Sequence, residues 1–115
     1  MTETVKRLIE TLKQSVPFVE LRANSTDRYL EAVLLNAHVA GCCETLRQTL
    51  GSPVKDFGER VRFERELKQA VERLGGIQID QCLFFTTGDQ GQVAYAMLWP
   101  WASDQSRVTL KLGLL

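Results

Sequence analysis

The chain has 115 residues, of which 44% are hydrophobic and 24% are charged. This composition is typical of a folded globular protein and argues against intrinsic disorder. Fourteen basic residues balance fourteen acidic ones, so no net charge draws the protein to nucleic acid or to an anionic membrane surface. The length predicts a single domain, residues 1–115. Three cysteines and a charged N-terminus without a signal-peptide pattern favour a cytoplasmic location.

Helical spacing dominates the first part of the chain, residues 1–76. Four apolar residues recur at that spacing near the N-terminus, and Pro17 is expected to end this first helix. They are Val5, Leu8, Ile9 and Leu12. A further helix is predicted for residues 53–76, with a kink or break near Gly58 and with ion pairs between residues four positions apart.

The segment between these helices has two interpretations. Its good helix formers favour one long helix from residue 28 to a stop at Gly51. Alternatively, residues 18–22 and 28–35 form a β-hairpin around ANSTD, and a helix begins only near Asn36. We favour the long helix, because Leu, Ala and Glu dominate the segment and β-branched residues are few.

Residues 77–115 change from helical spacing to an alternation of period two. Three antiparallel strands are predicted there, IQIDQCLFFTT, QVAYAMLW and RVTLKLGLL, with a tight turn at GDQG between the first two. In the third strand Arg107, Thr109 and Lys111 alternate with apolar residues, which predicts an edge strand.

The predicted fold is therefore α+β, with about three helices packed in two layers on a three-stranded antiparallel meander. A fourth strand at 18–22 is added if the hairpin interpretation holds. A turn with Asp89 and Gln90 at its tip would place Phe84 opposite Tyr95. Both faces of the first two strands would then be apolar, so the second face needs a cover. That face would carry Cys82, Phe84, Val93, Tyr95, Met97 and Trp99.

The unusual feature of the sequence is an aromatic series that ends in Trp99–Pro100–Trp101. Its candidate contact residues are Tyr95, Met97, Trp99 and Trp101. Three interpretations are open: these residues pack beneath the first helix as core, they form an interface with a partner, or they line a pocket for an apolar ligand.

No motif for catalysis, metal or cofactor binding is found. His38 and Cys42 stand four residues apart, but there is no Cys-x-x-Cys pair and no second histidine to complete a zinc site. The glycine-rich patterns that bind nucleotides are absent. We therefore expect no cofactor, no metal and no catalytic residue.

The function expected from these observations is that of a non-enzymatic accessory, adaptor or regulatory module. It would act through the aromatic sheet face and the loop around Pro100, as a homodimer or with another protein. The alternative is a small-ligand-binding domain whose pocket is lined by Trp99 and Trp101. A Cys/His-dependent enzyme that uses Cys42 and His38 is the third possibility.

Overall fold

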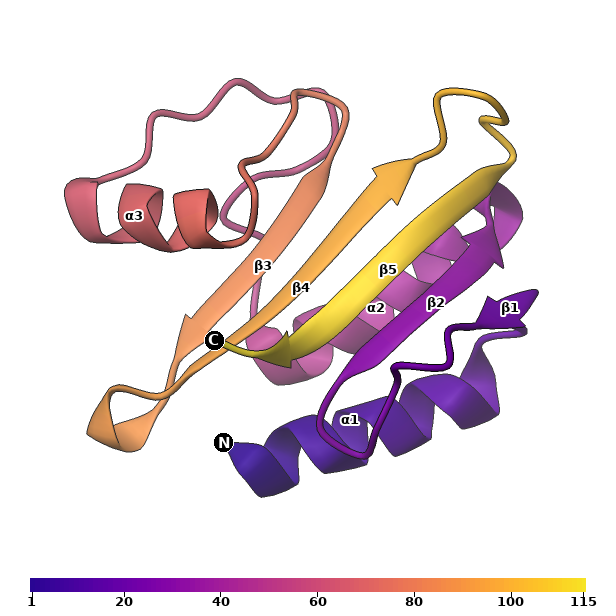
Figure 1. Ribbon diagram of the computed structural model, residues 1–115, viewed down its shortest axis with the longest axis horizontal. Helices are drawn as coiled ribbons and strands as arrows, with labels where there is room; N and C mark the ends of the chain where they lie inside the picture. The colour runs from indigo at the N-terminus through magenta and orange to yellow at the C-terminus, as the bar shows by residue number, and fades with distance from the viewer.

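Five strands form one antiparallel sheet, in the order β1-β2-β5-β4-β3, in the computed structural model, which describes residues 1–115 (Figure 1). Three α-helices and two short 3₁₀ turns complete the chain, so the predicted α+β class is confirmed. The elements are α1 (Thr2–Ser15), β1 (Glu20–Leu21), β2 (Leu30–Leu35), η1 (Asn36–His38), α2 (Val39–Leu50), α3 (Arg65–Arg73), β3 (Cys82–Thr87), η2 (Asp89–Gly91), β4 (Val93–Pro100) and β5 (Arg107–Leu114).

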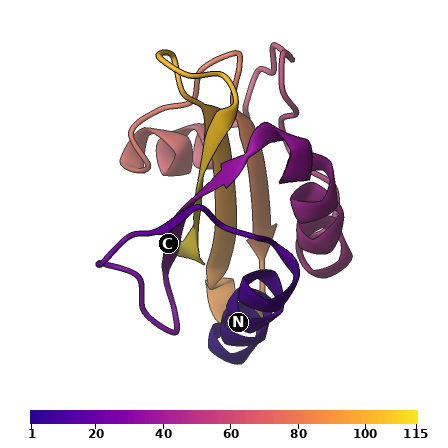
Figure 2. The same ribbon diagram turned by 90° about the vertical axis from the view of Figure 1, so that its right-hand side faces the viewer.

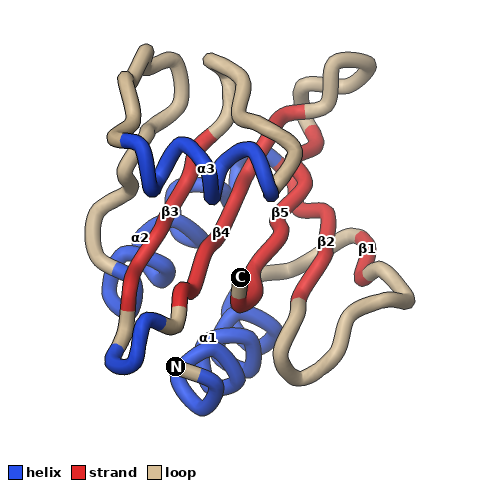
Figure 3. The backbone as a smooth tube through the Cα atoms, turned by 60° about the vertical axis from the view of Figure 1, so that its left-hand side comes forward, coloured by secondary structure: helices blue, strands red, loops and turns tan.

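The sheet lies between two helical layers. Helices α1 and α2 cover one face, and α3 lies on the other (Figures 2 and 3). The prediction of two layers is therefore wrong, because α3 packs on the opposite side from α1 and α2. The four apolar residues expected on the inner side of α1 are all buried in the main core. None of the helices is long and apolar enough to cross a membrane.

Strand β5 is the central strand of the sheet, whereas the sequence pattern predicted an edge. It pairs with β4 on one side and with β2 on the other. The alternation of polar and apolar residues in β5 therefore does not mark an edge strand, but a strand whose two faces meet different surroundings. Val108, Leu110 and Leu112 enter the main core beneath α1 and α2, while the polar side chains of β5 point to the face that carries α3.

The segment from residue 28 to 50 is strand, turn and helix, so the preferred long helix is wrong and the hairpin alternative is correct. Leu30, Ala32 and Leu34 alternate into the main core, and β2 pairs with β5 along its whole length. This tertiary pairing overrides the helix propensity of Leu and Ala. Helix α2 then ends where expected, at Gly51 with φ 80°. The fourth strand expected at 18–22 is confirmed by β1, which pairs with β2.

The pairing of β3 with β4 is shifted by one residue from the register that the sequence predicts. Thr87 pairs with Val93, and Phe84 lies opposite Ala96 instead of Tyr95. The connection is a longer loop that contains the 3₁₀ turn η2, with Gln90 at φ 65°. A shift of one residue exchanges the two faces of a strand. Cys82 and Phe84 therefore join the main core, and the side chains expected with them on β4 lie on the other face.

Only nine residues of the helix predicted at 53–76 are helical, Arg65–Arg73. Residues 54–64 form an extended connection, and Lys55 makes an isolated antiparallel bridge with Leu83 at the outer edge of β3. None of the ion pairs expected in this segment is formed. The charges lie on a loop and a short helix, so the helical spacing is lost for Asp56–Arg60 and Arg62–Glu66, while Glu64–Lys68 and Lys68–Glu72 keep that spacing without forming an ion pair.

Lys55 anchors this connection from inside the protein. Its side chain is only 3% exposed, and its Nζ donates hydrogen bonds to the backbone carbonyls of Asp56, Ile79 and Gln81, at 3.0, 2.9 and 2.6 Å. The three donors of the ammonium group are thereby all used. Lys55 thus joins the segment before α3 to the segment after it, and holds both at the β3 edge.

We expect Lys55→Met to lower the free energy of unfolding by about 2 to 4 kcal/mol, because the three backbone carbonyls that accept from the buried Lys55 would lose their donor. Urea unfolding of both proteins measures this loss. Lys68→Met is the matched control, since Lys68 is exposed on α3, and should change stability by less than about 0.5 kcal/mol. Equal effects of the two changes would contradict the anchoring role.

Candidate functional site

Half of one sheet face carries no helix. Helix α3 lies over β3 and β4, whereas β5 and β2 remain uncovered on the same face (Figures 1 and 3). Alternate residues of a strand share a face, so this area is populated by every second residue of β2 and β5, by the end of β4 and by the loop that follows. We call it the open face. Its outer layer is formed by the half-buried Glu31, Trp99, Trp101, Arg107 and Lys111, and Val33, Thr109 and Gly113 lie buried beneath them.

The four contact residues predicted from the sequence are divided between two environments. Tyr95 and Met97 are buried in a small apolar cluster beneath α3, together with Val71 and Leu83. Trp99 packs against the margin of this cluster and is half-buried. Trp101, in the loop after β4, is also half-buried. The open face therefore carries the two tryptophans, while Tyr95 and Met97 lie inside.

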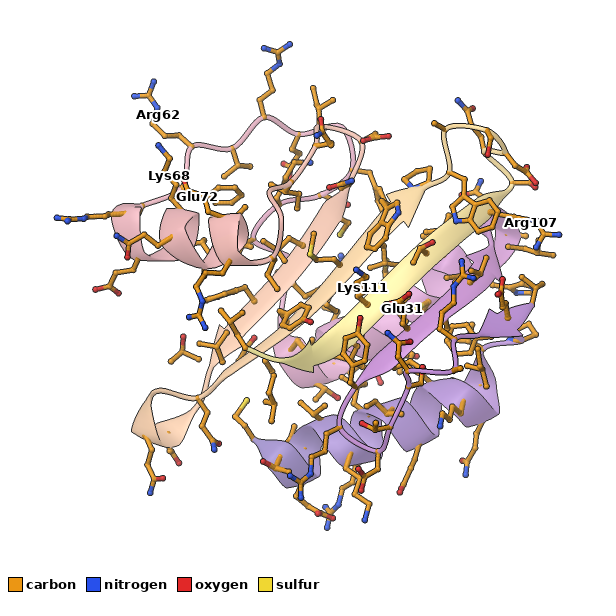
Figure 4. The ribbon with its side chains drawn as sticks, in the orientation of Figure 1. Glu31, Arg62, Lys68, Glu72, Arg107 and Lys111 are labelled. Atoms are coloured by element: carbon orange, nitrogen blue, oxygen red, sulfur yellow. The ribbon has the colours of Figure 1, made fainter.

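A connected set of polar contacts runs across the open face to Trp99. The Lys111 ammonium lies 5.3 Å from the centre of the Trp99 ring and 3.9 Å from Glu31 Oε1. Tyr29 Oη donates a 2.7 Å hydrogen bond to the same carboxylate oxygen. Figure 4 shows Glu31 and Lys111 side by side near the middle of the sheet. Gly113 allows Tyr29 to approach, since a Cβ there would stand 3.0 Å from the Tyr29 ring.

Glu31 is the centre of this arrangement. Besides Tyr29 and Lys111, its carboxylate receives a hydrogen bond from the Asn24 amide and lies 3.9 Å from Arg22 Nε. The hydrogen bond from Tyr29 lowers the pKa of Glu31, and the nearby cations act in the same direction, while partial burial opposes them. Burial, followed by the hydrogen bond to Glu31, raises the pKa of Tyr29. Glu31 is therefore held as a carboxylate by its neighbours.

A second set of contacts orders the loop that carries Trp101. The indole Nε1 donates a 2.7 Å hydrogen bond to Thr109 Oγ1, so the ring is attached to the central strand. Arg107 lies 5.9 Å from the centre of this ring and 3.3 Å from Asp104. Hydrogen bonds from Ser106 lower the pKa of Asp104, and Arg107 adds to this effect. These contacts hold the Trp101 ring in one orientation.

The charges of the open face and its margin balance. Three cations, Arg22, Arg107 and Lys111, alternate with three anions, Glu20, Glu31 and Asp104, and each cation lies within 4 Å of an anion. Lys111 lies next to the Trp99 ring and Arg107 next to the Trp101 ring. The surface is therefore aromatic and locally polar, but without a field of one sign.

The open face is a broad surface and not a pocket. Five cavities of about 230 to 490 Å³ lie elsewhere, and neither Trp99 nor Trp101 lines any of them. One of these cavities does reach the middle of the Trp-Pro-Trp motif. It measures about 430 Å³ and lies at the end of the sheet, between Pro100, Val108 and Phe57.

His38 and Cys42 do not form the arrangement that a cysteine nucleophile requires. Both line a cavity of about 280 Å³ between α1 and α2, but His38 is exposed and Cys42 is completely buried. Burial raises the pKa of Cys42 to about 12. A catalytic thiol needs the opposite shift, so this geometry favours a structural role for Cys42.

No protein-family model, curated protein or solved structure matches the chain. The function is therefore argued from its own side chains. No group of three or more His, Cys, Asp or Glu residues is placed to hold a metal ion. What the open face offers is two ordered aromatic rings and a set of paired charges, which are contacts for a broad partner surface.

Sequence reasoning missed Glu31, Lys111 and Arg107 as members of this site. The signal for the last two was present in the alternation of β5, which was interpreted as a solvent-facing edge. Glu31 was assigned to a helix, where its relation to Lys111 is lost. These two residues are neighbours because Glu31 pairs directly with Lys111 between β2 and β5.

We expect the free energy of unfolding of Glu31→Gln to fall less than that of the wild type as the pH is lowered into the acid range. Because its folded-state pKa is lowered, Glu31 stabilises the fold above its usual pKa, and this contribution is lost as the pH falls through the folded-state value. Urea unfolding should show the variant less stable by about 1 kcal/mol at pH 7 and equal to the wild type near pH 2. Glu72→Gln, on the exposed side of α3, is the control. An unchanged pH profile in Glu31→Gln would refute the prediction.

Proposed function

We propose that this protein is a non-enzymatic interaction module that docks through its open face, and that its partner is a second copy of the same chain. The observation that carries the proposal is the pair of half-buried, ordered rings of Trp99 and Trp101 on a part of the sheet that no helix covers. Trp and Arg are the side chains most enriched among the strong contacts of protein interfaces. The open face supplies both, with Arg107 beside Trp101.

The order of these side chains supports a docking role. Trp101 is fixed by its hydrogen bond to Thr109, and Trp99 is held between the α3 cluster and Lys111. Side chains that are ordered before association lose less conformational entropy when a partner binds. The open face is therefore preorganised for contact with a flat surface.

Charge complementarity selects a second copy as the partner. With its margin, the open face holds three cations and three anions, so two copies related by a twofold axis can place Arg107 or Lys111 of one against an acidic residue of the other. The whole chain has no formal net charge, which removes long-range repulsion between copies. A standard interface buries about 800 Å² per partner, roughly a tenth of the 6847 Å² surface of this molecule.

In this proposal the dimer is a cytoplasmic accessory or regulatory protein. The three free cysteines support a reducing location. The short edge strand β1 supports face-to-face docking over pairing of sheet edges. It has only two residues, and its Glu20 and the adjacent Arg22 are charged side chains of the kind that discourages edge-to-edge association.

A second candidate function rests on the cavity beside Pro100. Its wall is apolar at Val39, Phe57 and Val108, with Asn36 and Asp80 as polar groups, and its volume is about 430 Å³. That size suits a small, mainly apolar ligand. Binding to the folded state alone raises the apparent stability. A thermal-shift screen of small apolar compounds tests this candidate independently of the dimer.

The dimer proposal is tested by light scattering after size exclusion, over a dilution series. We expect a concentration-dependent dimer of the 13.0 kDa chain. Arg107→Glu and Trp101→Ala should each weaken it by about tenfold or more, because each removes an anchor of the interface. Circular dichroism should show unchanged helix content.

Lys68→Glu is the matched control for Arg107→Glu. Lys68 is exposed on α3, far from Arg107, as Figure 4 shows. The control variant should dimerise like the wild type. A monomer at every concentration, or equal weakening by both charge reversals, would rule out a homodimer through the open face.

A further inference from the structure

The cavity beside Pro100 is built from segments that lie far apart in the sequence. They come from the start of α2, the extended connection before α3, the turn before β3, and the ends of β4 and β5. The residues that line it are Asn36, Val39, Phe57, Gly58, Asp80, Pro100 and Val108. Its volume of about 430 Å³ lies within the usual range for small-molecule sites. The shape of the cavity therefore depends on the contacts that hold these segments together.

Hydrogen bonds fix the backbone at Asp80. This residue lies in a tight turn, which is closed by a 3.1 Å hydrogen bond from the Gln81 N–H to the Gln78 carbonyl. Lys55 Nζ donates hydrogen bonds to the carbonyls of the two flanking residues, Ile79 and Gln81, at 2.9 and 2.6 Å. The buried lysine thus holds the turn from both sides of Asp80.

The wall that carries Phe57 is joined to the same turn. The Gly58 N–H donates a 2.8 Å hydrogen bond to the Ile79 carbonyl. Gly58 has φ 78°, in the left-handed region that favours glycine. The Phe57 N–H donates a 2.8 Å hydrogen bond to Asp56 Oδ1. These two walls are therefore fixed relative to each other before a ligand enters, which lowers the entropic cost of binding.

The lining is mainly apolar and has a single charged side chain. Its apolar members are Val39, Phe57, Pro100 and Val108. The charged one is Asp80, and its carboxylate takes part in none of the ion pairs of the chain. Asn36 adds an amide group. A ligand in this cavity therefore meets an apolar surface and one unpaired negative charge.

The neighbouring charges leave the negative charge of Asp80 in excess. Lys55 and Asp56 precede Phe57 in the chain, and their opposite charges offset each other. The donors of Lys55 are all used by backbone carbonyls, so its ammonium group has none left for an anionic ligand. Helix α2 begins at Val39, but a helix N-terminus carries only about half a positive charge.

We propose that this cavity binds small organic cations, in which an ammonium group is attached to an apolar body. The ammonium group would pair with the Asp80 carboxylate and donate to the Asn36 amide oxygen. The apolar body would pack against Phe57 and Val108, and the Phe57 ring adds an attraction for a cation that lies over its face. The inference rests on the second candidate function, and it adds the charge of the ligand.

The test compares three probes that share one phenyl ring and differ in charge: phenethylamine, phenethyl alcohol and phenylacetate. Nuclear magnetic resonance titration of the full-length protein measures each dissociation constant, and the backbone amides of Val39, Gly58 and Val108 should report binding in the cavity. We expect the amine to bind about fivefold more tightly than the alcohol, the gain of one partly exposed ion pair. Phenylacetate should bind more weakly than the alcohol. Added salt should reduce the advantage of the amine.

A single substitution assigns the preference to Asp80. In Asp80→Asn the amine should bind no better than the alcohol, while the affinity for the alcohol stays unchanged. Asp89→Asn is the matched control, because Asp89 is exposed in η2, at the opposite end of β3. The control variant should keep the fivefold preference. Circular dichroism verifies that both variants are folded.

The outcomes separate this inference from the candidate function on which it rests. Equal binding of the three probes, or an amine preference that persists in Asp80→Asn, would overturn the preference for cations and leave the apolar ligand site standing. Absence of binding by all three probes would contradict the ligand site itself, and the inference with it.

Discussion

The pairing of β2 with β5 is the contact on which the architecture depends. It joins Leu30–Leu35 from the first third of the chain to Arg107–Leu114 at its end, residue against residue. Without it, the strands β3, β4 and β5 would be a meander whose last strand is an edge. With it, β5 becomes the centre of the sheet, and the apolar residues of both strands enter the core beneath α1 and α2.

The same pairing decides what the other face of the sheet presents. It places Glu31 opposite Lys111 and Val33 opposite Thr109. A charged pair and a buried pair of side chains therefore lie next to Trp99 and Trp101. Helix α3 is too short to cover this half as well as β3 and β4. The open face therefore arises because a nine-residue helix is set on a five-stranded sheet.

The two faces of the sheet carry different kinds of side chain. The open face depends on side chains that the pleat of β2, β4 and β5 turns away from the main core. The register of the β3–β4 hairpin turns Cys82 and Phe84 toward that core. Lys55 holds the segment between α2 and β3 at the β3 edge, through three backbone carbonyls.

The sequence by itself determined the features that rest on local pattern. These include the helix with Val5, Leu8, Ile9 and Leu12 inside, the α2 stop at Gly51, and the three C-terminal strands. Only the tertiary structure decided which strands are neighbours, on which face each side chain of β3 lies, and whether residues 28–35 are helix or strand. The reason is physical: local propensities differ by less than about 1 kcal/mol per residue, whereas strand pairing between distant segments adds hydrogen bonds and core burial that no local pattern records. The site follows the same division, because the tryptophans were visible in the sequence, but Glu31, which pairs with Lys111 beside Trp99, comes from β2 near the other end of the chain.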